Sequence, residues 1–173
     1  NAASQLAVIE DAETTSLFIQ NIADIFRYNL KSLDELVPLS DELEFVSNYM
    51  SILKMRFGER IAYEYSIDKD SLGIKIPRIT LQPIIENAYI HGLQNLERNG
   101  TIRLETKVQN EVLLISIEDD GMGMTKEQVD NLINEDNADE TAVENSNKHL
   151  SGIGVSNVIK RLKLSFQVEE NQK

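Results

Sequence analysis

The chain has 173 residues, which is enough for one ordinary domain or for a small domain with a helical arm. Its formal net charge of −12 argues against a nucleic-acid-binding protein, because that function needs clustered Lys and Arg. Nucleotide binding stays open, since Mg²⁺ and backbone N–H groups can hold phosphates on an acidic protein. The absence of cysteine excludes disulfides and thiolate chemistry, and the presence of only two histidines argues against a structural zinc site.

The ends of the chain show no targeting signal. No apolar run approaches the roughly 18 residues of a membrane span, and no signal peptide is visible. The sequence begins at Asn1, without an initiator methionine, inside a stretch with helical periodicity. We therefore expect a segment of a longer protein.

Two helices are predicted, over residues 1 to about 33 and over residues 43–57. Apolar residues of the first recur at steps of three and four, which marks a wide apolar face. These residues are Leu6, Ile9, Leu17, Ile22, Ile25, Phe26, Leu30 and Leu33. Ser40, Asp41 and Glu42 supply a cap and acidic residues at the start of the second helix, and Gly58 ends it.

Two long helices joined by a short connection predict an antiparallel hairpin. One hairpin buries little apolar surface by itself, so we expect two copies to pair into a four-helix bundle. The alternative is that the hairpin packs onto the rest of the same chain. We assign residues 1–58 to a helical dimerisation region and residues 59–173 to a second domain.

From Ile61 onwards the pattern alternates between strands and helices. Strands are predicted over residues 61–67, 101–108 and 112–118, and residues 166–168 are expected to begin another. Helices are predicted over residues 79–92, 124–133 and 152–164, with Pro83 in the first turn of its helix, where the missing N–H does no harm. This order indicates an α+β fold in which a helical hairpin precedes a two-layer α/β sandwich, rather than a doubly wound parallel sheet.

The first of three segments that could carry chemistry is LQPIIENAYIHG, from Leu81 to Gly92. Asn87 and His91 are four residues apart and so share one helix face, while Glu86 is displaced by about a third of a turn. An Asn amide oxygen is a hard ligand suited to Mg²⁺. Taken alone, the segment is equally compatible with a helix that carries scattered polar residues.

The second segment, IEDDGMGM, follows a predicted strand and ends at Met124. Asp119 can accept a hydrogen bond from an exocyclic amine such as that of adenine. Gly121 and Gly123 let the backbone approach a flat ring or turn sharply. The same pattern occurs in ordinary turns and in calcium loops, although the further oxygen ligands of an EF-hand loop are missing here.

The third segment, SGIGVSN, opens a predicted helix at Ser151. Gly152 and Gly154 leave backbone N–H groups free to face an anion, and the helix dipole adds to the attraction. The segment lacks the GK[ST] of a P-loop and the third glycine of a Rossmann turn. A polar stretch over 134–150 precedes it, which we expect to be a lid that orders over bound phosphates rather than a passive linker.

In this order the three segments resemble the N, G1 and G2 boxes of the GHKL, or Bergerat-fold, ATPases. The segments LQPIIENAYIHG and SGIGVSNVIKRL are similar in sequence to those of the LytS/YesM-like sensor histidine kinases. The resemblance covers nearly the whole chain. In the helical region it rests on Phe26-Arg27-Tyr28, Leu39 to Leu43, Tyr49 and Arg56-Phe57.

The resemblance implies a binding site for ATP and Mg²⁺. Asn87 would bind the Mg²⁺ that bridges the phosphates, with His91 near the phosphates or their water shell. Glu86 is a candidate for a metal-shell or proton-accepting role, and Asp119 would accept a hydrogen bond from the adenine amine. The other nucleotide contacts would come from Gly121, Gly123, Met124, Gly152, Ile153, Gly154 and Val155.

The chain departs from the family pattern in three respects. Many GHKL ATPases have an acid or a second Asn four residues before the metal-binding Asn, where this chain has Pro83, so water activation for ATP hydrolysis is not implied. Neither His91 nor His149 stands in the Pro-His-Phe segment that carries the family's phospho-accepting histidine, and His149 is expected to be a solvated loop residue. We therefore expect that the chain cannot phosphorylate itself. The family's closing strands are expected to lie beyond Lys173.

The resemblance thus implies a protein-histidine kinase that transfers the γ-phosphoryl group of ATP to a histidine outside this chain and then to an aspartate of a response regulator. The expected partners are a second copy of the chain and a response-regulator receiver domain, with no nucleic acid and no direct membrane contact. The expected location is the cytoplasmic part of a bacterial membrane-anchored sensor. The alternatives are a GHKL ATPase of the topoisomerase, chaperone or mismatch-repair kind, which lacks the preceding hairpin, or a nucleotide-binding dimerisation module without phosphotransfer.

Overall fold

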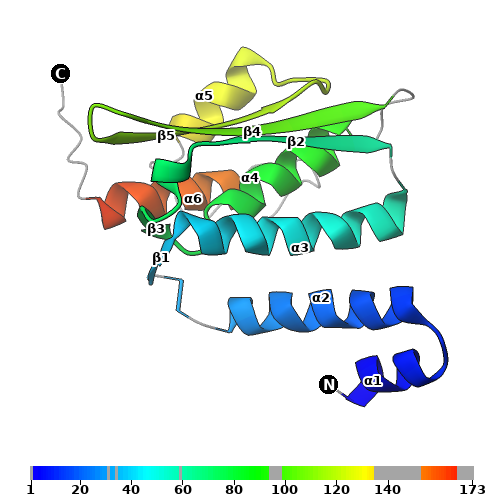
Figure 1. The fold of residues 1–173 in the computed structure, drawn as a ribbon. Helices are drawn as coiled ribbons and strands as arrows, with labels where there is room; N and C mark the ends of the chain where they lie inside the picture. The colour runs from blue at the N-terminus through cyan, green and yellow to red at the C-terminus, as the bar shows by residue number, and fades with distance from the viewer. Residues whose placement is uncertain are drawn as a thin grey trace, which may run out of the picture.

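The computed structural model describes residues 2–30, 32–33, 35–58, 60–93, 99–134 and 153–166. The amino-terminal half consists of helices α1 (Ala2–Ile9), α2 (Glu13–Asn29) and α3 (Leu39–Phe57). α2 and α3 run antiparallel, as predicted, and α3 lies between α2 and the rest of the fold (Figure 1).

The prediction of one helix over residues 1–33 is wrong, because the helix breaks at Asp11. Asp11 has a φ of 55°, a left-handed conformation that Asp tolerates better than most residues, and α1 folds back onto α2. Ser4 and Ser16 share a hydrogen bond of 2.8 Å across this contact, and Gln20 donates one of 2.9 Å to Ser4. The polar contact leaves much of the predicted apolar face exposed. The exposed members are Leu6, Ile9, Leu17, Phe26, Leu30 and Leu33.

The start of α3 also differs from the prediction. The helix begins at Leu39, and Ser40 does not cap it; the Ser40 hydroxyl instead donates to the Asp41 carboxylate at 3.2 Å. Glu42 was expected among the acidic residues that favour the helix start, but its side chain is wholly buried. It faces inward because it lies on the same stripe as the buried residues Leu39 and Val46.

The three predicted strands are confirmed as one mixed sheet in the order β2 (Ile61–Ile67), β4 (Gly100–Gln109) and β5 (Val112–Asp119). β4 pairs parallel with β2 and antiparallel with β5. A second sheet pairs β1 (Leu36–Pro38) with β3 (Lys75–Pro77), and the short 3-10 helix η1 (Lys69–Ser71) precedes β3. The sequence did not predict β1 and β3, because three residues are too few to show alternation.

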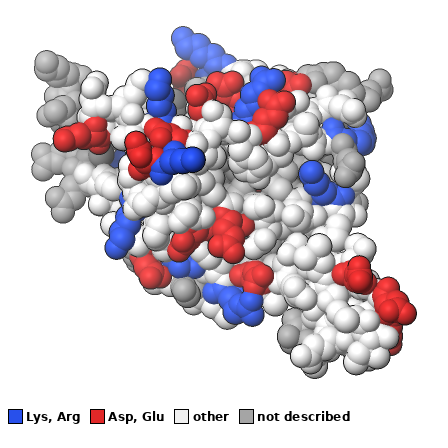
Figure 2. Space-filling model, in the orientation of Figure 1, with Lys and Arg blue, Asp and Glu red and all other residues white. Residues whose placement is uncertain are grey.

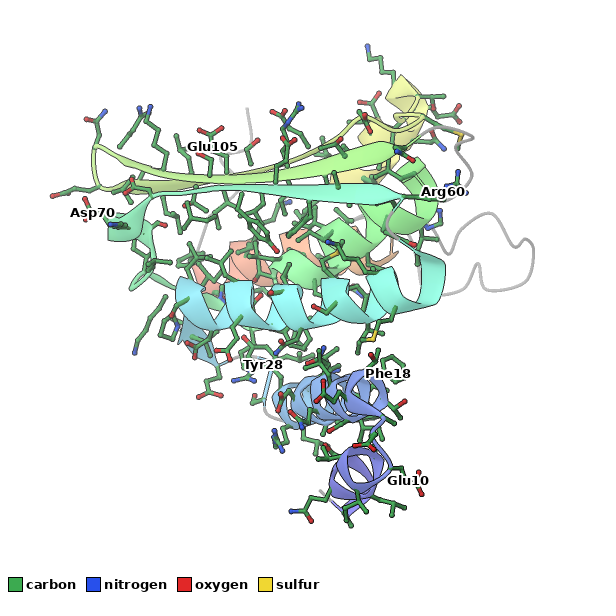
Figure 3. The ribbon with its side chains drawn as sticks, turned by 45° about the vertical axis from the view of Figure 1, so that its right-hand side comes forward. Glu10, Phe18, Tyr28, Arg60, Asp70 and Glu105 are labelled. Atoms are coloured by element: carbon green, nitrogen blue, oxygen red, sulfur yellow. The ribbon has the colours of Figure 1, made fainter. Side chains whose placement is uncertain are left out.

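The sheet forms one layer, and helices cover one of its faces, so the two-layer sandwich is confirmed (Figure 1). The covering helices are α3, α4 (Leu81–Asn87) with its continuation η2 (Ala88–Leu93), and α6 (Ile153–Ser165). Ile102, Leu104 and Thr106 of β4 are buried against them, whereas Glu105 points away from the helical layer (Figure 3). Helix α5 (Lys126–Asn134) follows β5.

Some predicted features lie outside the described residues. They are the lid over 134–150 apart from Asn134, His149 within it, and residues 167–168 of the strand predicted to begin at 166. Phe166 does not begin a strand, because its N–H donates to the carbonyl of Leu162 at 3.1 Å and so extends the last turn of α6. In the parts of the chain that the structure describes, no helix is both long and apolar enough to cross a membrane.

The sheet offers a matched pair of leucines for testing which face carries the core. Leu104 on β4 is 1% exposed and Leu114 on β5 is 49% exposed. We expect Leu104→Ala to lower the free energy of unfolding by about 2–5 kcal/mol, because it opens a cavity in the core. Leu114→Ala should change it by less than about 0.5 kcal/mol. Urea denaturation of both variants checks this, and equal losses would show that the outer face is also covered.

Candidate functional site

The segment that carries Glu86, Asn87 and His91 is not one continuous α-helix. α4 ends at Asn87, and the chain continues as a π-helix from Ala88 to Leu93. The prediction of a regular helix to Gly92 is therefore wrong over its last turn. π-helical turns are rare and often found at functional sites. Asn87 is half-buried and His91 is exposed, so both polar side chains lie at the surface of a segment whose opposite face is in the core.

Glu86 is directed toward the helical hairpin. Gln82 donates a hydrogen bond of 2.7 Å to its carboxylate from one turn earlier in α4. Tyr49 of α3 also interacts with this pair: burial, followed by the Glu86 carboxylate, raises the pKa of Tyr49 to about 12. Glu86 therefore belongs to the contact between α3 and α4, one side of the helix, while Asn87 occupies the next position around it.

The Asp119 turn is held tightly against the end of η2. The N–H of Gly121 donates to the Asp119 carboxylate at 2.9 Å, and the N–H of Met122 donates to the carbonyl of Gly92 at 3.2 Å. A Cβ atom added at Gly121 would lie 2.4 Å from the Gly92 carbonyl oxygen, and one added at Gly92 would lie 2.6 Å from Asp119 Oδ1. Gly121 therefore requires glycine, because the atom it approaches is backbone, whereas a side chain at Gly92 would displace the Asp119 carboxylate.

Gly92 packs against the Asp119 turn, and the sequence did not single it out. It closes the predicted helical segment LQPIIENAYIHG, where a glycine reads as an ordinary helix end. In the structure Gly92 has a different role, because its missing side chain lets Asp119 lie directly against the helix backbone. The signal that could have found it was its position, one residue after His91 in the first of the three segments.

The first turn of α6 lies against the first turn of α4. A Cβ atom added at Gly154 would be 3.3 Å from the Cβ of Pro83, so the glycine lets the two turns approach closely. Val155 is half-buried beside it. Gly152 and the side chain of Ile153 lie outside the described residues, and their predicted phosphate contacts stay predictions.

One helical segment therefore joins the two glycine segments. The Asp119 turn meets it at Gly92 and α6 meets it at Pro83, near its two ends. Asn87 lies between these contacts. Gly123 and Met124 extend beyond the turn: a Cβ built at Gly123 meets nothing within 4 Å, and Met124 is 45% exposed. The arrangement places a half-buried amide between two glycine-rich backbone turns, which suits a ligand with phosphate groups and a flat ring.

Models of two protein families match this chain. The model described as "Histidine kinase" matches residues 1–61, and the model described as "Histidine kinase-, DNA gyrase B-, and HSP90-like ATPase" matches residues 75–172. The second match covers more than half of the chain's 173 residues. The chain belongs to this ATPase family. The family resemblance seen in the three sequence segments is thus confirmed.

Curated relatives of this family member are sensor proteins. The sensor histidine kinase BtsS of Escherichia coli (strain K12) is 37% identical over 109 residues, which are 63% of this chain and 19% of BtsS. The sensor histidine kinase YesM of Bacillus subtilis (strain 168) is 29% identical over 161 residues, which are 93% of this chain and 25% of YesM. The sensor protein LytS of Oceanobacillus iheyensis is 33% identical over 164 residues, which are 94% of this chain and 27% of LytS. The chain thus spans between 19% and 27% of the length of these relatives.

A methyl group added at Gly121 should damage the packed turn of this family member. Gly121→Ala is expected to lower the free energy of unfolding by about 1–3 kcal/mol, because the neighbouring Gly92 carbonyl is backbone and cannot rotate away. Gly73→Ala is the control: a Cβ there meets nothing within 4 Å, and we expect no loss of stability. Urea denaturation measures both. An unchanged midpoint for Gly121→Ala would mean that the turn does not lie against Gly92.

Proposed function

We propose that this chain is the kinase core of a sensor histidine kinase, which binds Mg·ATP and transfers its γ-phosphoryl group to a histidine and then to an aspartate of a response regulator. The observation that supports this most is the packing of the Asp119 turn against Gly92 at the end of the Asn87 helix, in a chain that belongs to the ATPase family. The histidine kinase match over residues 1–61 adds the helical hairpin to that argument.

The Asp119 turn is assigned to the adenine ring. Asp119 Oδ1 accepts from the Gly121 N–H, so we assign its second oxygen to the exocyclic amine of adenine. Gly123 has a φ of 69° and open space around it, which suits the edge of a flat ring. Met124 supplies an exposed apolar side chain next to this space, and Gly154 and Val155 belong to the helix start assigned to the phosphates.

The donor set around Asn87 fits Mg²⁺ that is shared with phosphates. In the described ranges no three His, Cys, Asp or Glu side chains are grouped to hold a metal by themselves. Mg²⁺ commonly takes one or two protein ligands together with substrate phosphates and water, which matches a single half-buried amide. Asn87 would hold the ion, and exposed His91 would contact the phosphates or their water shell.

Phosphoryl transfer asks the protein mainly to position the reactants and to neutralise charge. The bond between the γ-phosphorus and the β–γ bridging oxygen breaks, its electron pair leaves with ADP, and a new phosphorus–nitrogen bond forms on a neutral imidazole. We assign Glu86 to accept the imidazole proton, because its carboxylate lies next to Asn87 in the last turn of α4.

The helical hairpin is assigned to pairing with a second copy of the chain. The apolar side chains that the sequence places on it stay exposed, among them Ile9 at 78%, Phe26 at 63% and Leu30 at 83%. The lobe formed by α1 and α2 shows mostly uncharged atoms on the face seen in Figure 2, with acidic residues at its outer edge. Exposed apolar surface of this kind marks an interaction site and favours dimerisation over packing within one chain.

The same proposal places the chain on the cytoplasmic side of a membrane-anchored bacterial sensor, with a receiver domain as its second partner. The alternative within the ATPase family is an enzyme of the topoisomerase, chaperone or mismatch-repair kind, and the histidine kinase match over residues 1–61 argues against it. A nucleotide-binding dimerisation module without phosphotransfer is the other alternative, and the transfer experiment below distinguishes it.

Asp119→Asn should weaken ATP binding more than GTP binding. The Asn side chain keeps an oxygen for the Gly121 N–H but loses the charged acceptor for the adenine amine. Such a hydrogen bond contributes about 1.5–3 kcal/mol, so the Kd for ATP should rise roughly 10-fold or more. Asp120→Asn is the control, since the Asp120 carboxylate accepts from the Thr101 N–H at 2.8 Å instead. Calorimetry with both nucleotides measures this, and an unchanged Kd for ATP in folded Asp119→Asn would remove Asp119 from the site.

Phosphotransfer is tested with radiolabelled ATP, Mg²⁺ and an added protein that carries a histidine in a Pro-His-Phe helical segment. We expect acid-labile label on the added protein and none on this chain. Asn87→Ala should lower the transfer rate by about 100-fold or more, because the metal and the phosphates lose their position. Asn48→Ala removes another half-buried Asn, from α3, and should leave the rate unchanged. Nucleotide binding without any transfer by the wild-type chain would favour the non-catalytic module.

A further inference from the structure

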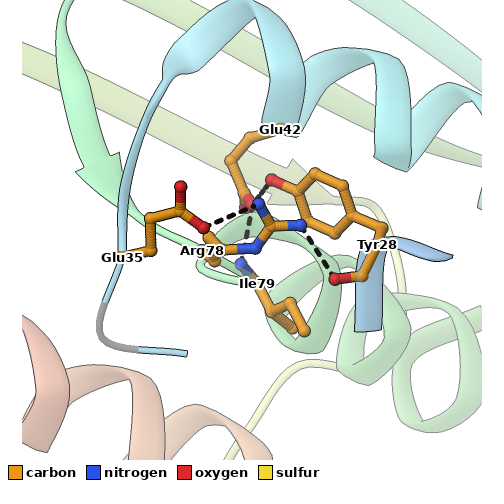
Figure 4. Close-up of polar contacts among 5 residues, drawn as sticks. All are labelled: Tyr28, Glu35, Glu42, Arg78 and Ile79. Atoms are coloured by element: carbon orange, nitrogen blue, oxygen red, sulfur yellow. Dashed lines mark hydrogen bonds and ion pairs between the residues drawn. The ribbon is translucent and has the colours of Figure 1, made fainter. Parts of the chain in front are cut away.

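A buried carboxylate on α3 binds the start of α4 (Figure 4). Glu42 is wholly buried, and its oxygens accept from the N–H groups of Ile79, Thr80 and Leu81 at 2.7, 2.8 and 3.1 Å. Its fourth donor is the hydroxyl of Tyr28 on α2, at 2.5 Å. A buried carboxylate is costly unless hydrogen bonds replace its lost water, and these four donors do so.

Tyr28 is held from two sides. Its hydroxyl donates to Glu42, and its carbonyl accepts a 2.8 Å hydrogen bond from the guanidinium of Arg78, which is 2% exposed. The same guanidinium lies 3.8 Å from the centre of the Tyr28 ring and 3.4 Å from the carboxylate of Glu35. Burial, then the Glu42 carboxylate, raises the pKa of the Tyr28 hydroxyl, which therefore stays protonated as a donor. Tyr28 lies between α2 and α3 in Figure 3.

The backbone between these contacts is strained. Ile79 has a φ of 53°, a left-handed conformation that is unfavourable for a β-branched residue. Its N–H is held by Glu42, and its carbonyl accepts a 2.6 Å hydrogen bond from Arg161 of α6. Arg161 also donates to the carbonyl of Arg78 at 2.8 Å. The strained turn is therefore fixed by side chains from α3 and α6, on either side of it.

We propose that Glu42 is a positioning residue for α4, the helix that ends at Asn87. Its hydrogen bond to Tyr28 makes the position of α4 depend on α2. We call the side chains of Tyr28, Glu42, Arg78 and Arg161 the junction. Displacing α2 removes one donor from the buried Glu42 carboxylate and one acceptor from Arg78. The junction holds the strained Ile79 turn, which relaxes when these contacts weaken, and its relaxation moves the start of α4 and its contact with α6.

The inference rests on the proposed function, because it takes α4 and α6 to be nucleotide-binding helices. It makes a further claim, which is that nucleotide affinity and the stability of α2 are linked. Linkage between two sites is reciprocal, so nucleotide must stabilise α2 by the same factor by which an intact junction strengthens nucleotide binding. A junction that served only to hold the fold together would lower the melting temperature when altered and leave the Kd unchanged.

The test uses Tyr28→Phe, which removes only the hydroxyl. The ring remains to cover Arg78 and to stack on Phe45, at a centroid distance of 4.3 Å. With Mg²⁺ and a non-hydrolysable ATP analogue, we expect the Kd to rise about 5-fold or more. In the wild-type chain the analogue should slow hydrogen exchange of the α2 amides, residues 13–29, and in Tyr28→Phe it should slow them less. Tyr65→Phe removes a hydroxyl on β2 and should match the wild type in both measurements.

Arg161→Lys tests the same link from α6, because Lys cannot donate to both carbonyls in the fork geometry that Arg uses. We expect it also to raise the Kd and to reduce the effect of the analogue on α2. If the wild-type chain does not bind the analogue, the proposed function and this inference both fail. If it binds, and both variants lower the melting temperature while the Kd and the response of α2 stay at wild-type values, only the inference fails.

Discussion

The carboxylate of Glu42 accepts three backbone N–H groups at the start of α4, and the rest of the site depends on where that helix begins. α4 is seven residues long, which is too short for a helix to be stable by itself in water. Its start must therefore be fixed from outside. A carboxylate on α3 does this better than a cap on the same segment would, because it also fixes α4 relative to the hairpin.

Once the start of α4 is fixed, the two glycine contacts follow from helix geometry. Pro83 in the first turn meets Gly154, and Gly92 at the end of η2 meets the Asp119 turn. Pro83 is the residue at which the chain departs from many GHKL ATPases, which have an acid or Asn there. In this chain the position has a packing role, since the proline ring bears on Gly154 and its missing N–H needs no partner at the helix start.

The sequence predicted most of the fold because alternation and helical periodicity are local signals. The strands β2, β4 and β5 and the helical layer were predicted for this reason. It missed the break at Asp11 and the π-helical turn, which depend on tertiary contacts rather than on composition. The domain boundary at residues 58–59 stays a prediction.

The sequence located the segments of the candidate site but not the contacts between them. Asn87, Asp119 and Gly154 stay predicted site residues, whereas Gly92 was interpreted as a helix end, because its position after His91 does not show that the Asp119 turn packs against it. The burial of Glu42, by contrast, could have been predicted from its spacing in the sequence. Glu42 lies at the helical spacing of Leu39, Val46, Met50 and Leu53, the buried stripe of α3, and a carboxylate on such a stripe needs buried donors.

The position of Tyr28 near the end of α2 gives the proposed coupling a direction. α2 has 17 residues and so spans about 25 Å. Its last turn is held by Glu42 and Arg78, and its exposed apolar residues extend from Leu17 to Phe26. Pairing of the hairpin through its exposed residues would set the angle of α2 relative to α3. A change in this angle would act on the hydrogen bond between Tyr28 and the buried Glu42 carboxylate. Because the charge has no water to replace a lost donor, a small displacement of α2 carries a large energetic penalty at the start of the Asn87 helix.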